Sequence, residues 1–419
     1  MGSKDITLGD VVTLSSGGTP SKKNPNFWSG RIPWVSAKSM DADRINKNVL
    51  YITESGLNSG SRLADAGSIL LLTRGSGLFT RIPVIWVSSP VAFNQDIKCI
   101  TAKDPTDARF IYHWLISMRG VFTKTLDVTG IGAGKINTDQ LLSMRIYWPD
   151  TETRQRITCI ADPITNRIHV NRRINDYLTE LRDALVKSQI SDALDEGRGA
   201  WQVVPLQEAA NIQSGYSYKS AELVDGSTIG MLGIKNFDRS GSFRPDGFKS
   251  IKPERVKPSQ YVNIGDIVVA HTDLTQNADI IGRAIQVIDD GGYKQMIESL
   301  DLVKVTSARE DVSNEFLAAL LGTEDFHRHC LAYVNGTTVL HLGKKALPEY
   351  ELKIPDDKQV MTRLDSLFKT IAGIQSELIR ENRFLGQLRD TLLPKLMSGE
   401  IDVTQVELPM QPNNHLSAG

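Results

Sequence analysis

A glycine-rich segment with a lysine is the first stretch of this sequence whose residue types could do chemistry. It reads TGIGAGKI and runs from residue 129 to residue 136. A nucleotide-binding P-loop has four residues between its glycines, and its lysine is followed by Ser or Thr. Here three residues separate Gly130 from Gly134, and Ile136 follows Lys135. The spacing disfavours a nucleoside triphosphate site, and leaves a contact to DNA phosphate or a plain surface turn.

A second short motif, NPNF at residues 24–27, is close to the motif with which adenine amino-methyltransferases hold a flipped base. The second proline and a G-x-G loop for a methyl donor are missing, which indicates a turn. No Ser-His-Asp order, H-E-x-x-H pair or carboxylate dyad stands out. Cys99, Cys159 and Cys330 are too far apart for a Cys-x-x-Cys metal site. We therefore expect no catalytic residue, no metal and no cofactor in this chain.

Composition predicts a globular protein of two or three domains. The chain has 419 residues, of which 40% are hydrophobic and 23% charged. No apolar run has the length of a membrane span, and the first ten residues, MGSKDITLGD, contain no apolar signal core. The expected location is therefore the cytoplasm, without a membrane partner.

Charge is balanced overall but clustered locally. The net charge is −1, whereas residues 1–150 hold 17 Lys and Arg against 12 Asp and Glu. Residues 15–40 contain four cations and no acid, and residues 326–348 contain three cations, three histidines and no acid. Such basic islands indicate local contacts to an anion, although a solvated face is the usual alternative.

The sequence contains an internal repeat, so the segments that would position these residues occur in two similar copies. LGDVVTLSSG at residue 8 recurs as LQEAANIQSG at residue 206, and IPWVSAKSMD recurs as IGMLGIKNFD, which places Lys38 opposite Lys235. DIKCI pairs with DLVKV, FIYHWL with FLAALL, and IYWPD with LKIPD. The offset between copies drifts slowly from 197 to 206, as loop insertions would produce. Each copy begins as a mixed α/β unit with short β-rich runs between Gly and Pro turns.

Each copy then ends in a long amphipathic helix with a heptad pattern. The positions seven apart are Ile157, Ile164, Asn171, Leu178 and Leu185 in the first copy and Leu364, Ile371, Leu378, Leu385 and Leu392 in the second. They are accompanied by Ile160, Ile174 and Leu181, and by Leu367, Ile374 and Leu388. Over more than four heptads this pattern predicts a coiled coil between the two helices. Packing of each helix into its own domain is the alternative.

The resulting fold class is α+β, with two mixed α/β domains separated by two long antiparallel helices and an internal pseudo-twofold repeat. Asn171, Arg167 and Glu381 at core positions would fix the helix register. Residues 157–187 as a helix measure about 46 Å, slightly more than the roughly 34 Å of one DNA turn. The expected boundaries are residues 1–150, first domain; 151–198, first spacer helix; 199–356, second domain; 357–403, second spacer helix; and 404–419, flexible tail.

Three segments together resemble a known family. GGTPSKKNPNFWSGRIPWVSAKSM at residues 17–40, VAFNQDI at 91–97 and LGQLRDTLLPKLMSGEIDV at 385–403 are similar to the specificity subunit of type I restriction-modification enzymes, HsdS. The similarity covers the whole chain in the right order and includes the two-copy plan. The first helix follows YWPDTETRQRI instead of a Pro-rich turn, and SGYSYKS in the second domain lacks the Thr-Pro of the first.

The resemblance implies two target recognition domains, each reading half of a bipartite double-stranded DNA site. It implies that two methyltransferase (HsdM-like) subunits dock on the chain and methylate adenine N6, and that restriction (HsdR-like) subunits join them. Catalytic motifs and cofactor sites would belong to those partners. A tandem scaffold without a DNA role and a self-sufficient DNA methyltransferase are the rival functions.

Polar residues in the basic islands and on adjoining loops are the candidate DNA contacts. Lys and Arg would mostly hold phosphate, whereas Asn and Gln can pair with adenine edges. In the first domain the candidates are Ser21, Lys22, Lys23, Asn24, Trp28, Arg31, Lys38, Arg74, Gln95 and Lys135. In the second they are Tyr218, Lys219, Lys235, Asn236, Arg239, His271, Thr272, Gln276, Asn277, Thr338, His341 and Lys344.

The helices carry the candidate contacts to protein partners. These are Tyr177, Leu181, Leu185, Leu388 and Leu392. The heptad pattern assigns them first to the coiled-coil core and second to a partner surface. Trp28 and Trp34 could stack on a displaced base, but burial in the core is commoner for tryptophan.

Overall fold

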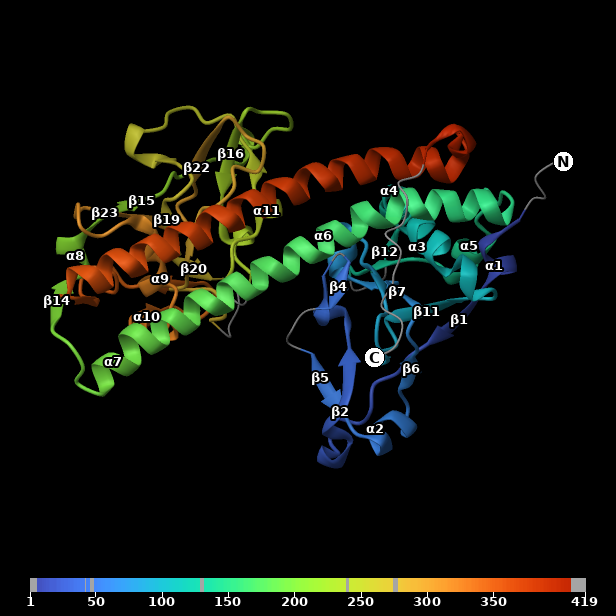
Figure 1. Cartoon of the computed structure of the whole chain (residues 1–419), viewed down its shortest axis with the longest axis horizontal. Helices are drawn as coiled ribbons and strands as arrows, with labels where there is room; N and C mark the ends of the chain where they lie inside the picture. The colour runs from blue at the N-terminus through green and yellow to red at the C-terminus, as the bar shows by residue number, and fades with distance from the viewer. Residues whose placement is uncertain are drawn as a thin grey trace. The chain divides into compact units, whose positions relative to one another are not determined.

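The structure is a computed structural model that describes residues 6–41, 43–45, 49–128, 132–238, 241–273 and 278–407. Contacts within the chain divide it into two units. Unit 1 comprises Met1–Arg167 and Phe384–Gly419, and unit 2 comprises Ile168–Arg383. Each unit takes one part of each long helix, α6 (Thr151–Val186) and α11 (Lys358–Ser398), which are drawn in green and red in Figure 1.

Unit 1 is built on two four-stranded sheets and one small sheet. The first is β1-β11-β7-β9, at Val12–Ser16, Ile97–Ala102, Ile69–Leu72 and Val84–Trp86. The second is β5-β2-β10-β6, at Leu50–Ile52, Trp28–Val35, Val91–Phe93 and Arg62–Ala64. The small sheet is β12-β13-β8, at Asp127–Val128, Gly134–Lys135 and Arg74–Gly75, and β3 and β4 form a hairpin at Met40–Asp41 and Arg44–Ile45.

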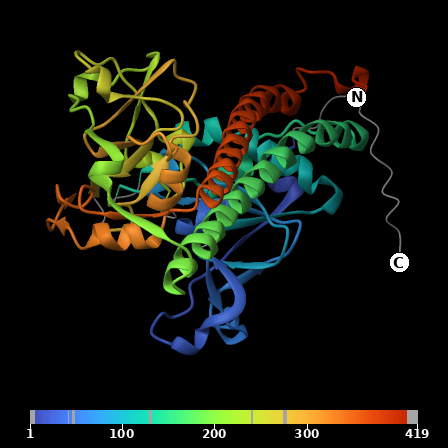
Figure 2. The same ribbon diagram turned by 60° about the vertical axis from the view of Figure 1, so that its left-hand side comes forward.

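Short helices close the core of unit 1. They are α1 (Leu8–Val11), α2 (Glu54–Asn58), α3 (Ala108–Ser117), α4 (Arg119–Lys124) and α5 (Thr138–Ser143). All four residues of β7, a continuous apolar run, are buried, as expected of a strand covered on both faces. The core extends from β7 to Phe110 of α3 and to Leu393 and Leu396 of α11. The end of α11 is therefore part of the core of unit 1, beside the beginning of α6 (Figure 2).

Unit 2 repeats this plan with the same strand orders. Its larger sheets are β15-β23-β19-β21, at Ala210–Ser214, Leu302–Ser307, Ile267–Ala270 and Ala284–Gln286, and β17-β16-β22-β18, at Lys249–Ser250, Ile229–Leu232, Gln295–Glu298 and Tyr261–Val262. Its small sheet is β20-β25-β24, at Thr272–Asp273, Leu340–Leu342 and Val334–Asn335. β14 (Trp201–Pro205) pairs with β26 (Glu351–Pro355), and the helices are α7 (Asp192–Asp195), α8 (Leu206–Ala209), α9 (Asn314–Leu321) and α10 (Glu324–Leu331).

Strand register confirms the duplication read from the sequence. Leu14 of β1 pairs with Ile100 of β11, and Ile212 of β15 pairs with Val305 of β23, each in the middle of a five-residue antiparallel ladder. β10 runs parallel to β2, and β22 runs parallel to β16, in an otherwise antiparallel sheet. The fold is therefore α+β with an internal repeat, as predicted.

Both long helices begin at a capping aspartate. The carboxylate of Asp150 accepts a hydrogen bond from the Thr153 amide at 2.9 Å, and that of Asp357 accepts one from the Gln359 amide at 2.8 Å. These bonds satisfy amides that have no partner within the helix. α6 is continued by a π-helical turn, Lys187–Ser191, before α7.

Within unit 2, α6 and α11 pair in opposite directions. Gln375 Nε2 donates to Thr179 Oγ1 at 3.0 Å, whereas Arg363, twelve residues earlier in α11, reaches Gln189, ten residues later in the chain. Asn171 is fully buried between the helices, as the heptad pattern predicts, and donates to Glu381. These contacts confirm the predicted antiparallel direction of the two helices for the segments within unit 2.

The prediction is wrong at four positions of the seam. Ile157, Asn171, Leu364, Ile371 and Leu378 are buried, but Ile174, Leu181, Leu367 and Ile374 are 37% to 49% exposed. Thr165, Ile168 and Gln375 take the interior positions instead. A straight helix drifts relative to a strict seven-residue repeat, so part of the second apolar series turns toward solvent.

Candidate nucleic-acid interface

Three strands of unit 1 bring Arg74, Lys135 and Asp127 into one cross-strand row. In the antiparallel sheet β12-β13-β8, Arg74 lies opposite Lys135, and Lys135 lies opposite Asp127. Residues directly opposite each other in a sheet project from the same face. Arg74 and Asp127 are exposed and Lys135 is half-buried. We call these three residues the unit 1 row; it joins two predicted DNA contacts, Arg74 and Lys135, that are 61 positions apart in the sequence.

Unit 2 has a row at the corresponding place. Thr272 of β20 lies opposite His341 of β25, and His341 lies opposite Asn335 of β24. His341 and Asn335 are exposed, and Thr272 is half-buried. Two more predicted contacts, Thr272 and His341, are thereby brought together. We call Thr272, His341 and Asn335 the unit 2 row.

The same backbone hydrogen bonds hold both rows. The four bonds join Thr73 N to Asp96 O at 2.9 Å, Ile136 N to Thr73 O at 2.9 Å, His271 N to Asp301 O at 2.7 Å, and Leu342 N to His271 O at 2.9 Å. Thr73, which precedes Arg74, is thus held by the carbonyl of Asp96 after β10, and His271, which precedes Thr272, is held by the carbonyl of Asp301 after β22. The rows are structurally equivalent, although their side chains differ in every position.

Asp301 also fixes the unit 2 row through its side chain. Its carboxylate accepts a hydrogen bond from Thr272 Oγ1 at 2.8 Å. In unit 1 the carboxylate of Asp96 accepts instead from Asn94 Nδ2 at 2.9 Å. His271, predicted as a DNA contact, is half-buried, and burial together with the neighbouring His341 lowers its pKa.

The acid-free segment of unit 1 displays its cations to solvent. Ser21, Lys22, Lys23, Arg31 and Lys38 are exposed. Their exposure is compatible with the predicted phosphate contacts, which stay a prediction. The two amides of this candidate set are less available: Asn24 caps the short helix Pro25–Phe27 by accepting from Asn26 N, and Gln95 accepts from Thr19 Oγ1 at 2.7 Å.

The two tryptophans of this segment are used in packing. Trp34 is 4% exposed and donates from Nε1 to the Gly18 carbonyl at 3.1 Å. Trp28 is half-buried, meets Trp34 edge to face at 5.3 Å between ring centroids, and donates to the Ser21 carbonyl. Trp34 is therefore a core residue, and Trp28 holds the loop that carries Lys22 and Lys23.

Asn236 was predicted as a DNA contact, and this prediction is wrong. It is fully buried, accepts from the Gly233 amide at 3.0 Å, and donates to the Arg244 carbonyl at 3.0 Å. Ser39 makes the equivalent bond to the Ser36 amide in unit 1. Asn236 thus closes a turn of the backbone, while the preceding Lys235 is exposed like its counterpart Lys38.

The remaining candidates of unit 2 lie apart from the row or outside the described residues. Lys219 pairs with Glu254 at 2.9 Å, and Tyr218 accepts from Lys249 at 3.3 Å. Thr338 and Lys344 are exposed. Arg239, Gln276 and Asn277 lie outside the residues that the structure describes.

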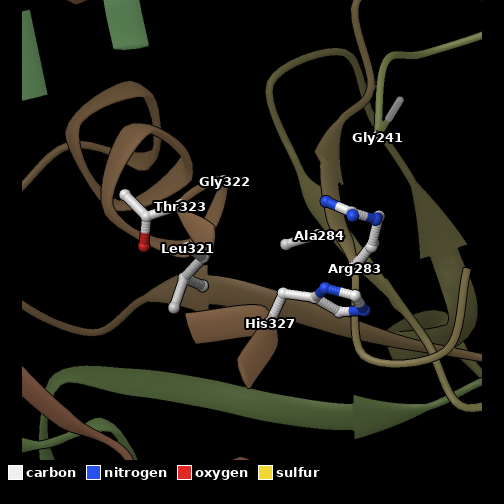
Figure 3. A pocket seen from close by; sticks show the side chains of 7 residues that line it. All are labelled: Gly241, Arg283, Ala284, Leu321, Gly322, Thr323 and His327. Carbon is white, nitrogen blue, oxygen red and sulfur yellow. The ribbon is translucent and has the colours of Figure 1, made fainter. Parts of the chain in front are cut away.

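Two of the three histidines in the second basic island support the fold. His327 is 7% exposed, and its Nδ1 lies 3.6 Å from Glu324, which also pairs with Arg283 at 2.8 Å. Burial lowers the pKa of His327. Figure 3 shows Arg283 and His327 on one side of a small pocket, facing Leu321, the last residue of α9, and Thr323, which caps α10. His329 contacts the Ala346 carbonyl at 2.8 Å, which leaves His341 as the exposed histidine of this island.

A buried carboxyl ends strand β22 of unit 2. Glu298 is fully buried at the end of β22, and within the described part of the chain neither of its carboxyl oxygens has a hydrogen-bond partner. Burial raises its pKa to about 8, an effect that nearby Lys304 reduces. Phe93 ends β10 at the equivalent place in unit 1 and is also fully buried.

Sequence reasoning missed the third member of each row. Neither Asp127 nor Asn335 was among the predicted DNA contacts. At the repeat offset of 206, which matches Lys135 to His341, Asp127 corresponds to Tyr333 and not to Asn335. The third members therefore follow only from the strand register, in which Asp127 lies opposite Lys135 and Asn335 lies opposite His341.

The candidate partner contacts divide into an outer and an inner group. Tyr177 is 55% and Leu181 49% exposed, and with Val170 and Ile174 they form an outward apolar stripe on α6 within unit 2. The Arg173 guanidinium donates to the Tyr177 hydroxyl at 2.9 Å. Leu185 packs against the core of unit 2, and Leu392 against that of unit 1, so both serve the interior. Leu388 is half-buried.

The described part of the chain has neither a metal-binding cluster nor a membrane-spanning helix. There, no three His, Cys, Asp or Glu side chains are grouped so that they could hold a metal ion. No helix in the same residues is long and apolar enough to cross a membrane.

Comparison with known proteins gives one consistent result. Residues 2–180 match the family described as Type I restriction modification DNA specificity domain. The specificity subunit of the Escherichia coli type I restriction enzyme EcoR124I/EcoR124II is 34% identical over 167 residues, which are 39% of this chain and 41% of that subunit. The MjaIX specificity subunit of Methanocaldococcus jannaschii is 21% identical over 95% of this chain and 93% of its own.

A solved structure shares the fold over nearly the whole chain. The type I restriction-modification S subunit of M. genitalium covers 93% of this chain with a TM-score of 0.51 at 15% identity. The duplicated α+β unit with its two long helices is therefore also the fold of that S subunit. Residues 2–180 of this chain match the specificity domain family that the sequence motifs indicated.

Proposed function

We propose that this chain selects the DNA sequence for a type I restriction-modification complex by reading a bipartite duplex site. The observation that carries the proposal is the pair of equivalent rows. The backbone hydrogen bonds around them are the same in both units, whereas their side chains differ at every position. Two recognition surfaces that read two different short DNA sequences, here called words, require a common backbone with different polar side chains.

Exposed cations of unit 1 supply the other part of a DNA contact. Lys22, Lys23, Arg31 and Lys38 can neutralise phosphates, which gives affinity without sequence information. The balanced net charge of −1 is no obstacle, because the cations of unit 1 are clustered. We assign phosphate contacts to these residues and base contacts to the rows.

We further propose that the chain is not itself an enzyme and acts in the cytoplasm with partners. Two methyltransferase subunits would supply adenine-N6 methylation, and restriction subunits would supply cleavage. The outward stripe of Val170, Ile174, Tyr177 and Leu181 on α6 offers an apolar helix face for a partner. An exposed apolar stripe of this kind is uncommon unless a partner covers it.

The two long helices are proposed to set the separation between the two DNA words. The coiled coil and the domain boundaries predicted from the sequence suit this role. Each word would be read by one unit, and the length of the helices would determine the gap of unspecified base pairs between them.

The decisive experiment is coexpression of the chain with the methyltransferase subunits encoded in the same host, followed by mapping of methylated adenines across a genome. A single motif with two short words and a fixed gap is expected. Methylation by the purified chain alone would instead favour a self-sufficient methyltransferase. Absence of salt-dependent duplex binding by the assembled complex would favour a scaffold without a DNA role.

A further inference from the structure

The two rows occupy the same place in the fold but carry different kinds of side chain. The unit 1 row is ionic, with two cations and one carboxylate: Arg74, Lys135 and Asp127. The unit 2 row has uncharged hydrogen-bonding groups and one histidine: Thr272, His341 and Asn335. Because the backbone positions are equivalent, any difference in recognition between the two rows must come from their side chains.

The carboxylate in the unit 1 row argues against a phosphate contact. Asp127 lies directly opposite Lys135 and is exposed on the same face of the sheet. A phosphate approaching Lys135 would meet this negative charge, at a cost that a purely phosphate-binding row would avoid. The ligand that suits the row must offer hydrogen-bond acceptors to Arg74 or Lys135 and a donor to Asp127.

A G·C base pair has this arrangement in the major groove. Guanine presents the acceptors N7 and O6, which Arg and Lys bind, and cytosine presents the N4 amino group, which a carboxylate accepts from. An A·T pair suits the unit 2 row in the same way, because Asn pairs with adenine N6 and N7 and the Thr methyl contacts the thymine methyl.

Both rows are held firmly enough to discriminate between bases. The residues before Arg74 and Thr272 are tied to the carbonyls of Asp96 and Asp301 at 2.9 and 2.7 Å. The Thr272 hydroxyl is oriented further by the Asp301 carboxylate at 2.8 Å. Side chains on a fixed backbone lose less entropy on binding, which favours specific contacts over adaptable ones.

We propose that the unit 1 row reads a G·C pair and that the unit 2 row reads an A·T pair, each within the DNA word of its own unit. This assignment rests on the proposed function, since it names the base pairs that the two recognition surfaces select. It makes Arg74, Lys135, Asp127, Thr272, His341 and Asn335 specificity-determining residues. Lys22 and Lys23, by contrast, contribute affinity alone.

Row exchange in the assembled methyltransferase complex tests the proposal. The first variant carries Arg74→Thr, Lys135→His and Asp127→Asn, and the reciprocal variant carries Thr272→Arg, His341→Lys and Asn335→Asp. Mapping of methylated adenines should show that the first variant loses a required G·C pair in one word by about 5- to 100-fold. The other word should stay unchanged, and the reciprocal variant should alter only that other word.

Two further variants keep the test decisive. Asp127→Asn alone changes an exposed side chain on a short strand, so it tests the row if the triple variant does not fold. It should relax discrimination at the cytosine of the same base pair. Lys124→His repeats the charge change of Lys135→His at an exposed site on α4, and it should leave both words intact.

The outcomes distinguish failure of the base-pair assignment from failure of the proposed function. An unchanged motif with uniformly weaker binding and a shallower salt dependence would identify the rows as phosphate contacts and overturn the proposal. Words without the expected G·C and A·T pairs in the unaltered complex would overturn it as well. If the unaltered complex methylates no bipartite motif at all, the proposed function fails, which is a different result.

Discussion

Asn171 of α6 donates a hydrogen bond from Nδ2 to the Glu381 carboxylate of α11 at 2.8 Å, inside the helix pair of unit 2. The same amide group donates to Asn382 Oδ1 at 3.0 Å. Asn171 is fully buried, so these contacts replace hydrogen bonds to water for the groups of both helices. A polar contact at one position of an apolar seam makes other alignments of the helices costly.

Truncation of Asn171 should therefore destabilise unit 2. Asn171→Ala leaves Glu381 and Asn382 without this donor, and we expect the free energy of unfolding to fall by about 1 to 3 kcal/mol. The double change Asn171→Ala with Glu381→Ala should cost less than the sum of the two single changes, because the bond between the two side chains is lost only once. Urea unfolding of the four members of this double-mutant cycle measures the coupling, and additive effects would contradict the contact.

The buried Glu298 should make stability depend on pH. Its pKa is raised to about 8 in the folded chain, against 4.5 for an ordinary glutamate, so between these values the native state holds a proton that the unfolded state has released. The contribution is complete below about pH 4.5 and is lost as pH rises toward and through 8. Glu298→Gln should remove this slope and stabilise the chain at pH 8 by on the order of 3 kcal/mol.

Thermal unfolding of both forms from pH 5 to pH 9 checks this expectation. Glu310→Gln, on an exposed glutamate of the same unit, is the matched control and should leave the profile unaltered. Equal stability of the Glu298→Gln variant and the parent at every pH would show that the carboxyl is not held protonated.

Lys22 and Lys23 are expected to contact phosphate. Replacing both with Ala should weaken binding to duplexes of any sequence, because phosphate contacts carry no sequence information. The plot of log binding constant against log salt concentration should flatten by about 2 units of slope, one for each lost charge. Fluorescence anisotropy across a salt series measures this, and an unchanged slope would exclude both residues from the DNA contact.

The outward stripe on α6 should bind a methyltransferase subunit. Tyr177→Ser with Leu181→Ser removes two side chains that are 55% and 49% exposed, so the fold of the free chain should be preserved. Loss of central apolar contacts should weaken partner binding by about 2 kcal/mol or more. Asp183→Ser, an exposed change on the same helix, is the control, and retained affinity of the double variant in calorimetry would rule this face out.

Helix length should determine the gap in the recognised DNA. Insertion of one heptad at matched positions in α6 and α11 lengthens each helix by about 10 Å. At roughly 3.4 Å per base pair, the gap should grow by about three base pairs while both words stay the same. Methylation mapping decides the matter, and an unaltered gap would disprove a spacer role for the helices.

Much of the architecture was readable from sequence because the chain contains the same plan twice. Strand pairs such as Leu14 with Ile100 and Ile212 with Val305 lie where the repeat aligned them. The burial of Asn171 followed from its place in the heptads. Periodicity succeeded here because burial of one apolar face is a local property of the sequence.

The site was predicted less completely, and for a physical reason. Arg74, Lys135 and Asp127 become neighbours through strand register, which depends on hydrogen bonds between distant segments and not on local residue types. Asn236 looked like a free amide but caps a turn, and Ile174 and Leu181 looked like core residues but face outward. The sequence alone determined the duplicated plan and the pairing of the helices, since both arise from repeated local patterns. Only the tertiary structure decided which polar side chains share a face and which apolar ones remain uncovered, because both depend on contacts between segments far apart in the chain.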